Sequence, residues 1–159
     1  MSKGRPSKDF NKQQIENAIK WFKEVGIVVY GFFMLGLPGD TPKTMQDTIN
    51  FAKKANPDVA NFMITIPVPG TELYDMILKE GKFTYDVNYG SEYGFYGGNT
   101  FFETKKTKTE DVLMFYKKAY KEFYLRPNKI FELLSKCKSI DEVKWFANAI
   151  FFLSKGIFK

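Results

Sequence analysis

The sequence predicts an α/β fold in which parallel strands are followed by a helical C-terminal extension. Two nearly unbroken apolar runs, 27–37 and 59–66, are each followed by a glycine- and proline-containing turn and then by a helical pattern. Runs of this kind are typical of strands buried in a helix-covered parallel sheet. The order helix, strand, helix, strand, helix therefore indicates βαβ units. We expect one structural unit, with the α/β part over 1–105 and the helical extension over 106–159.

The first helix is predicted over 11–25. Asn11 and Gln14 have the spacing of a capping box, and Gly26 stands where a glycine commonly ends a helix. Its apolar residues follow the i, i+3, i+4, i+7 spacing of a single buried face. These residues are Ile15, Ala18, Ile19 and Phe22.

The second helix, over 42–55, is predicted from its two ends. Thr41 is a suitable N-cap residue, and Pro42 suits the first helical position. Pro57 restricts the residue before it to non-helical geometry, so the helix ends there. A short third helix is then expected between Thr71 and Gly81.

Residues 84–104 are rich in glycine, tyrosine, phenylalanine and asparagine and have no clear period. We expect a long ordered loop or irregular strands there. From Thr109 onward the pattern is helical again, with a bend or restart at Arg126–Pro127. Ser139 and Glu142 have the spacing of a capping box for a last helix.

The composition of the chain excludes several classes of function. Its 159 residues, 44% of them hydrophobic, are enough for one compact core. It contains no histidine, which excludes a Ser-His-Asp or Cys-His nucleophile pair and histidine metal ligands. The single cysteine, Cys137, excludes an intramolecular disulfide, and the N-terminal residues have no apolar secretory region. We therefore expect a cytoplasmic protein.

The net charge of +6 leaves two interpretations open, a basic surface that binds a polyanion and a lysine-rich surface exposed to solvent. The only arginines are Arg5 and Arg126, and the lysines are spread over every predicted helix. Nucleic-acid recognition favours arginine forks. We expect a solvated surface with no nucleic-acid partner, and we expect no membrane association.

Two turns stand out as candidate binding elements: GLPGDT (36–41) and PVPGT (67–71). Each follows a predicted strand and opens a helix, and ligands of α/β folds bind at this end of parallel strands. Glycine allows the backbone to approach a ligand closely. Glycine-proline turns after strands are more often structural, so these turns alone do not decide between the two roles. Neither turn has the Gly-Lys-Ser/Thr of a nucleotide-hydrolysing loop.

Three segments together carry a more specific resemblance. VYGFFMLGLPGDTPKTMQDTINFAKKANPD (29–58) and PVPGTELYD (67–75) resemble the fifth and sixth strand regions of radical S-adenosylmethionine (radical SAM) barrels. FYLRPNKIFELL (123–134) is similar to the tail of the cobalamin-associated subgroup, which includes anaerobic magnesium-protoporphyrin ester cyclases and methyltransferases. SKG (2–4), before the first helix, also resembles the segment after the fourth strand of these barrels, so the resemblance covers nearly the whole chain.

The resemblance implies the C-terminal portion of a partial (β/α)6 barrel, with about two parallel strands and their helices. It implies that SAM is bound at the two turns, and that strand alternation turns Phe32, Met34 and Gly36 toward the barrel interior and Phe33 and Leu35 toward the helices. The cofactor-binding residues that it implies are Met34, Gly36, Leu37, Pro38, Gly39, Pro67, Pro69 and Gly70. Asp40 stands where the family usually has glutamate, and we expect it to support the start of the helix.

The resemblance also implies parts that these 159 residues do not supply. In the family a CxxxCxxC loop holds a 4Fe-4S cluster, and that loop and a cobalamin domain would precede residue 1. Cys137 cannot replace three cysteines, and we expect no catalytic residue in this chain. We expect a SAM-binding, substrate-shaping half that acts on a small molecule together with an N-terminal half from the same gene or an adjacent reading frame. The alternatives are a non-catalytic half-barrel interaction module and a peripheral membrane protein.

Overall fold

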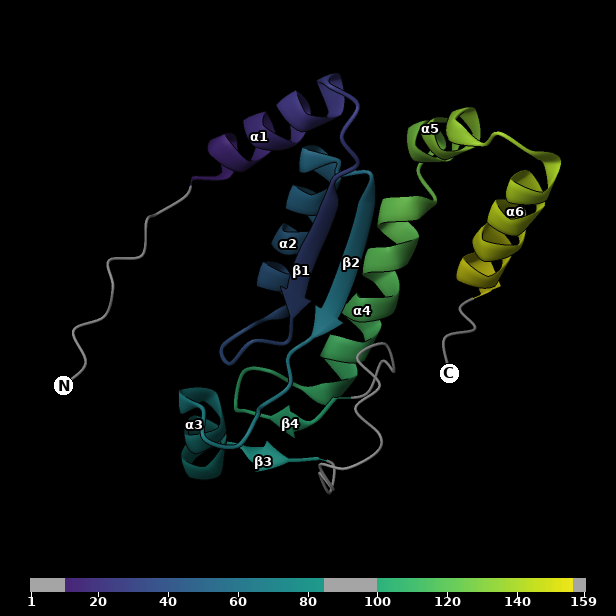
Figure 1. Cartoon of the computed structure of the whole chain (residues 1–159). Coiled ribbons are helices and arrows are strands. Elements are labelled where there is room, and N and C mark those ends of the chain that lie inside the picture. Colours follow the sequence, from purple (N-terminus) through teal and green to yellow (C-terminus); the bar gives the residue numbers. More distant parts are fainter. Residues whose placement is uncertain (1–10, 85–99, 156–159) are drawn as a thin grey trace.

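A computed structural model describes residues 11–84 and 100–155 and confirms the predicted α/β class (Figure 1). Six helices and four strands occur in these two ranges. In chain order they are α1 (Lys12–Glu24), β1 (Tyr30–Leu35), α2 (Pro42–Ala55), β2 (Val59–Ile64), α3 (Glu72–Glu80), β3 (Lys82–Phe83), β4 (Phe102–Glu103), α4 (Thr109–Tyr124), α5 (Pro127–Lys136) and α6 (Ile140–Lys155).

The two long strands, β1 and β2, form a parallel pair with α2 as the crossover helix. The register runs from Tyr30 opposite Val59 to Leu35 opposite Ile64. The described residues form an open two-stranded sheet and not a closed barrel. A second pair, β3 with β4, is antiparallel and two residues long. Most of the loop expected over 84–104 lies outside the described residues.

The helix boundaries follow the caps expected from the sequence. The Oδ1 atom of Asn11 accepts a hydrogen bond from the backbone N–H of Gln14 at 2.8 Å, and Gln14 Oε1 accepts one from the N–H of Asn11 at 3.1 Å. Thr41 caps α2 in the same reciprocal way, with Thr44 as its partner. Asn56 ends α2 in a left-handed conformation, with φ +48°.

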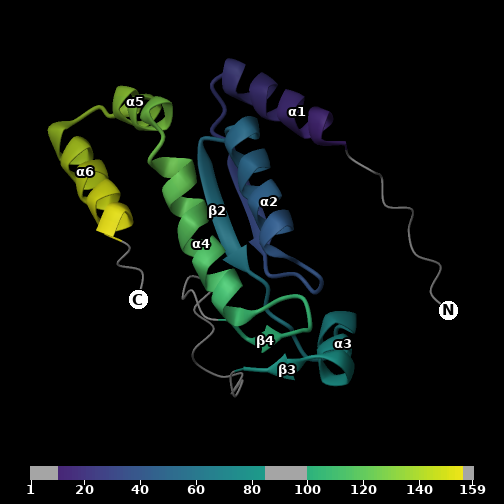
Figure 2. The same cartoon turned by 180° about the vertical axis from the view of Figure 1, so that it is seen from behind.

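One face of the β1–β2 sheet is buried under α2 and α4. Figure 1 shows the sheet in front of these two helices, and Figure 2 shows the helices in front of the sheet. Phe62 lies at the centre of this core, 2% exposed, and its ring contacts those of Phe33, Tyr120 and Phe123 at centroid distances of 5.4 to 6.2 Å. Aromatic pairs at these distances add to the free energy gained from burial. A smaller cluster packs α3 against β3 and β4.

The opposite face of the sheet is open. Tyr30, Phe32 and Met34 are 59%, 66% and 49% exposed, while Phe33 is half-buried and Leu35 is fully buried among the core residues. The alternation predicted for these strand residues is therefore confirmed. A row of exposed large apolar side chains on a strand is uncommon in a domain that is complete by itself.

The two edges of the sheet differ. On the outer edge of β2, the hydroxyl of Tyr124 donates to Ala60 O at 2.9 Å and accepts from Ala60 N at 3.0 Å. The hydroxyl of Tyr120 donates to Phe62 O at 3.2 Å. Both tyrosines project from α4, so this helix covers the edge of β2. The parallel pairing leaves the backbone groups of Tyr30, Phe32 and Met34 directed at the other edge, where no described strand pairs with them.

Across residues 11–84 and 100–155, the helices lack the combination of length and apolar character that a membrane span requires.

We expect the isolated chain to self-associate through the open face of β1, because this face combines exposed apolar side chains with an unpaired strand edge. Phe32→Lys places a charge on the face and should shift sedimentation velocity profiles toward the monomer. Phe131→Lys is the matched control, since Phe131 is 76% exposed but lies on α5. A monomeric wild-type chain, or an equal effect of both variants, would contradict this prediction.

Candidate functional site

The candidate site lies at the carboxyl end of the sheet, where both strands open into glycine-containing turns. Gly36, Gly39 and Gly70 have φ values of +75°, +92° and +82°. Residues with a Cβ rarely adopt these left-handed conformations, so the backbone itself requires glycine at these positions. The two strand ends are joined by buried Thr65, whose backbone N–H and hydroxyl both donate to Leu35 O at 3.0 and 3.1 Å.

Asp40 holds the first turn in shape. Its backbone N–H donates to Leu37 O at 2.9 Å, and its Oδ2 atom accepts from Leu37 N at 3.0 Å. The other carboxylate oxygen, Oδ1, accepts from the hydroxyl of Thr44 in the first turn of α2 at 2.8 Å. Asp40 therefore fastens the turn to the start of α2, which agrees with the supporting role expected for it.

Thr107, in the segment between β4 and α4, also holds this turn through hydrogen bonds. The sequence had not singled out this residue. Thr107 is 1% exposed, and its Oγ1 atom accepts from Gly39 N at 3.2 Å. Its hydroxyl donates toward Leu37 O at 3.1 Å and Asp40 O at 3.2 Å. The segment between β4 and α4 is thereby locked onto the turn after β1.

Gly36 does not face the open side of the sheet, so the orientation expected for it is wrong. The residue is buried, and a Cβ built on it would lie 2.9 Å from Cγ1 of Val112 in α4. The physical reason is its left-handed φ, which ends the strand alternation that extends from Phe32 to Leu35. Its glycine is needed for close packing between the turn and α4.

The remaining residues implied by the resemblance lie around this end of the sheet in different environments. Met34 and Leu37 present exposed side chains, 49% and 43% respectively. Pro67 is fully buried, whereas Pro69 and Gly70 are exposed.

Pro38 and Gly39 line a pocket of about 570 Å³, which we call the rim pocket. Its other walls come from α3 and from the segment that joins β4 to α4, and no residue of β1 or β2 lines it. The eight lining residues are Pro38, Gly39, Met76, Lys79, Glu80, Thr104, Lys105 and Lys106. The sequence had not singled out the other six lining residues, those of α3 and of 104–106. The available signal was the alternation of threonine and lysine in TKKTKT (104–109), whose Thr104 and Thr107 have the spacing of a local turn.

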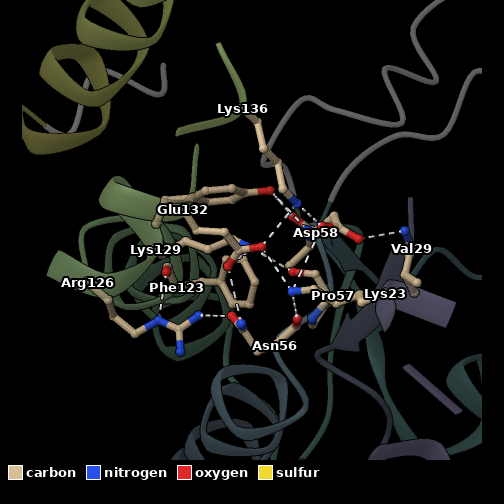
Figure 3. Close-up of polar contacts among 12 residues, drawn as sticks. Lys23, Val29, Asn56, Pro57, Asp58, Phe123, Arg126, Lys129, Glu132 and Lys136 are labelled. Atoms are coloured by element: carbon tan, nitrogen blue, oxygen red, sulfur yellow. Dashed lines mark hydrogen bonds and ion pairs between the residues drawn. The ribbon is translucent and has the colours of Figure 1, made fainter. Parts of the chain in front are cut away.

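A charged cluster occupies the opposite, amino end of the sheet (Figure 3). Lys129 of α5 is 1% exposed, and its Nζ atom donates to Pro57 O at 2.8 Å and to Glu132 Oε2 at 3.2 Å. Glu132 also accepts from Lys23 of α1 at 2.9 Å. Asp58 accepts from Val29 N at 2.8 Å and pairs with Lys136. The cluster joins α1, both strand starts and α5.

These contacts change the pKa values of the cluster. Burial opposes ionisation of Glu132, but the hydrogen bond from Lys23 and the charge of Lys129 outweigh it and lower the pKa of Glu132 to about 2. Burial lowers the pKa of Lys129. Each buried charge has an opposite charge or a carbonyl oxygen beside it. The cluster therefore has a structural role: it holds α1 and α5 to the starts of the two strands.

Arg126 lies beside this cluster and donates hydrogen bonds to the C-terminal ends of two helices, α2 and α4. Its guanidinium donates to Phe123 O at 2.9 Å, to Lys53 O at 2.8 Å and to Asn56 Oδ1 at 2.9 Å. All three acceptors are uncharged. Backbone carbonyls at the C-terminal ends of α2 and α4 lack helical partners and carry partial negative charge, which suits a guanidinium.

The described residues contain no group of three or more histidine, cysteine, aspartate or glutamate side chains placed to hold a metal ion. Cys137 is half-buried after the last residue of α5, and its Sγ atom contacts Leu133 O at 3.4 Å.

Comparison with known proteins finds methyltransferases and a cyclase. An uncharacterized methyltransferase of Pyrococcus horikoshii is 32% identical over 120 residues, which are 76% of this chain and 25% of that protein. The anaerobic magnesium-protoporphyrin IX monomethyl ester cyclase of Rubrivivax gelatinosus is 34% identical over 68 residues, 43% of this chain and 12% of the cyclase. The cytidylyl-2-hydroxyethylphosphonate methyltransferase of Streptomyces wedmorensis is 29% identical over 80 residues, 46% of this chain and 15% of that enzyme.

The chain therefore spans a quarter or less of the length of these curated relatives. No family model matches the sequence. No solved structure matches it. This chain is therefore similar to one part of each of these larger methyltransferase and cyclase proteins.

The packing role of Gly36 can be separated from its backbone conformation. Gly36→Ala and Gly39→Ala both place a Cβ at positive φ, at a cost of about 1–2 kcal/mol each, but a Cβ at Gly39 meets nothing within 4 Å. Gly36→Ala should therefore be the more destabilising, by a further ~1 kcal/mol or more because of the contact with Val112. Urea unfolding of Gly36→Ala, Val112→Ala and the double variant should give a favourable coupling. If the losses of unfolding free energy in the two single variants simply add in the double variant, Val112 does not clash with the new methyl group.

The acid sensitivity of the fold should depend on Glu132. Its folded-state pKa of about 2 lies below the ordinary 4.5, so its contribution to stability is complete above pH 4.5 and is lost as the pH falls toward 2. The loss should amount to at most about 3 kcal/mol. Glu132→Gln should lower stability at pH 7 and flatten the stability profile between pH 4.5 and 2, as measured by urea unfolding.

The control for this measurement is Glu24→Gln, because Glu24 forms an exposed pair with Lys20 on α1. This variant should keep the wild-type acid profile, since exposed pairs contribute little. An unchanged profile in Glu132→Gln would show that the cluster is not the origin of the acid sensitivity.

Proposed function

We propose that this chain forms the SAM-binding, substrate-shaping C-terminal part of a radical SAM enzyme of the cobalamin-associated type. Such an enzyme would need a cluster-bearing half, supplied by the same longer polypeptide or by a separate one. The proposal is supported by the segments that resemble radical SAM barrels and by relatives that are methyltransferases and a cyclase.

The observation that carries the proposal is the open face of the sheet. Tyr30, Phe32 and Met34 expose apolar side chains on this face, and the edge of β1 beside them has no partner strand among the described residues. The edge of β2, by contrast, is covered by Tyr120 and Tyr124. Additional strands can therefore join this sheet only at β1. Their addition would turn the open face into the wall of an interior cavity.

The residues at the carboxyl end of the sheet suit part of SAM. Met34 and Leu37 offer exposed apolar surface, which suits an adenine ring, and the glycine turn allows close approach of the backbone. Together with a reduced iron–sulfur cluster, SAM supplies radical hydrogen abstraction. In this proposal the present residues bind and orient the cofactor and exclude water from it.

The residues of this chain do not fit the cluster itself. A 4Fe-4S cluster requires cysteine thiolates, and this sequence has only Cys137 and no histidine. The thiolate ligands, and any cobalamin site, belong in this proposal to the cluster-bearing half.

A small-molecule substrate is the simplest extension from the relatives. The names of two relatives specify a magnesium-protoporphyrin ester and a cytidylyl phosphonate. Both are small organic molecules with negatively charged or metal-binding groups. We propose a small-molecule substrate for the complete enzyme without choosing between methyl transfer and cyclisation.

A second candidate is a half-barrel interaction module without catalytic function. The same open face supports it, because an apolar surface can dock a partner that carries no cofactor. The two functions differ in whether SAM binds to the assembled protein.

The test is to combine the chain with a cluster-bearing radical SAM half and to measure SAM affinity by calorimetry under anaerobic conditions. Met34→Glu places a charge on the open face and should weaken SAM binding about tenfold or more, which corresponds to about 1.4 kcal/mol. Phe33→Leu alters the covered face of the same strand, and it should lower thermal stability while leaving SAM affinity within about twofold, since the cost of such a change falls on packing.

Two results would contradict the proposal. An assembled wild-type protein with an intact cluster that does not bind SAM would favour the interaction module. A folded Met34→Glu variant that binds SAM as well as the wild type would remove the open face from the cofactor site.

A further inference from the structure

We infer that the rim pocket binds a phosphate-bearing ligand, at a site separate from the open face of the sheet. The pocket lies between the turn after β1, the C-terminal part of α3 and the segment that precedes α4. None of its lining residues belongs to β1 or β2, and it does not include Met34 or Leu37. The pocket shares Pro38 and Gly39 with the turn expected to approach SAM, but its charged walls lie on α3 and on residues 104–106, so the inference goes beyond the proposed SAM site and can be tested without SAM.

The lining of the rim pocket carries a net positive charge. Lys79, Lys105 and Lys106 contribute three positive charges, and Glu80 contributes one negative charge. Within the described ranges, none of these three lysines takes part in an ion pair. At the opposite end of the sheet, by contrast, Lys23 and Lys129 are paired with Glu132. The ammonium groups of the pocket are left available to an anion.

The wall of the pocket that carries Lys105 and Lys106 is fixed. Thr104 Oγ1 accepts from the backbone N–H groups of Lys106 at 3.3 Å and Thr107 at 3.0 Å, and Thr104 N donates to Thr107 O at 3.0 Å. Thr107 in turn is locked onto the turn after β1. Toward the described residues Thr104 Oγ1 acts as an acceptor, so its hydroxyl proton can be donated to a ligand. A fixed wall loses little conformational freedom when a ligand binds.

The side chains of the pocket also indicate the chemistry of the ligand. The lysine ammonium is a compact point charge that commonly binds phosphate, although arginine forks match phosphate as well as carboxylate. The pocket has lysines and no arginine. Its volume of about 570 Å³ is large enough for a diphosphate that carries an organic group. The backbone N–H of Gly39 is already bonded to Thr107, so the anion would be bound by side chains and not by the turn.

The test is calorimetric titration of the full chain with inorganic pyrophosphate, at constant ionic strength and without SAM or a cluster-bearing half. We expect saturable binding at one site. The variant carrying Lys79→Gln, Lys105→Gln and Lys106→Gln should bind at least tenfold more weakly. Lys79→Gln alone should have a smaller effect in the same direction, which keeps the test informative if the triple variant folds poorly.

The matched control carries Lys12→Gln, Lys117→Gln and Lys138→Gln. These lysines are exposed, form no ion pair in the described part of the chain and lie outside the pocket, so this variant loses the same charge. It should keep the wild-type affinity within about twofold. Equal weakening in both triple variants would show a general charge effect, and absence of saturable binding in the wild type would overturn the site.

Citrate serves as the carboxylate probe and should bind at least tenfold more weakly than pyrophosphate. Equal affinity for both anions would overturn the assignment to phosphate. Since these titrations contain no SAM, their outcome is independent of the proposed function: the pocket can fail while the cofactor site holds, and the reverse.

Discussion

The arrangement of this chain depends on the way α4 closes one side of a two-stranded sheet. Its buried residues cover the face of β1 and β2, and the hydroxyls of Tyr120 and Tyr124 bond to the backbone of Ala60 and Phe62 at the outer edge of β2. One helix thus satisfies both the apolar and the polar requirements of that strand. The unsatisfied surface of the sheet is concentrated on the other face and the other edge, where the proposed enzyme would need it.

The two ends of the sheet are stabilised by different means. At the amino end, Lys23, Lys129 and Glu132 form a charged cluster whose members hold α1 and α5 to the strand starts. At the carboxyl end, Asp40 and Thr107 fix the backbone of a glycine turn, and the lysines nearby have no ion-pair partners among the described residues. In α/β folds the carboxyl end is the usual place for ligands and the amino end serves stability. The distribution of charge here follows that division of roles.

The sequence was sufficient to predict the caps, both long strands and the two faces of β1, because these depend on local spacing of apolar and polar residues. It was also sufficient to locate the glycine turns. It failed for Gly36, because the left-handed backbone that turns this position toward Val112 has no period to extrapolate. It missed the contact of Thr107 with the turn after β1, since residues about 70 positions apart share no local pattern. It missed the three pocket lysines because the local pattern in 104–109 does not show that this segment and α3 meet at that turn. The uncharged acceptors of Arg126 were missed for the same reason.

The tyrosine contacts at β2 have a consequence for the order in which the chain folds. Tyr120 and Tyr124 reach strand residues 58 and 64 positions earlier in the sequence. During synthesis, β1 and β2 leave the ribosome long before α4 exists to cover them. For that interval the parallel pair exposes both of its edges, one entire face and the part of the other face that α2 does not cover, and non-local closure of this kind is slow. The nascent chain therefore passes through a stage in which chaperone binding competes with aggregation, and completion of α4 ends that stage.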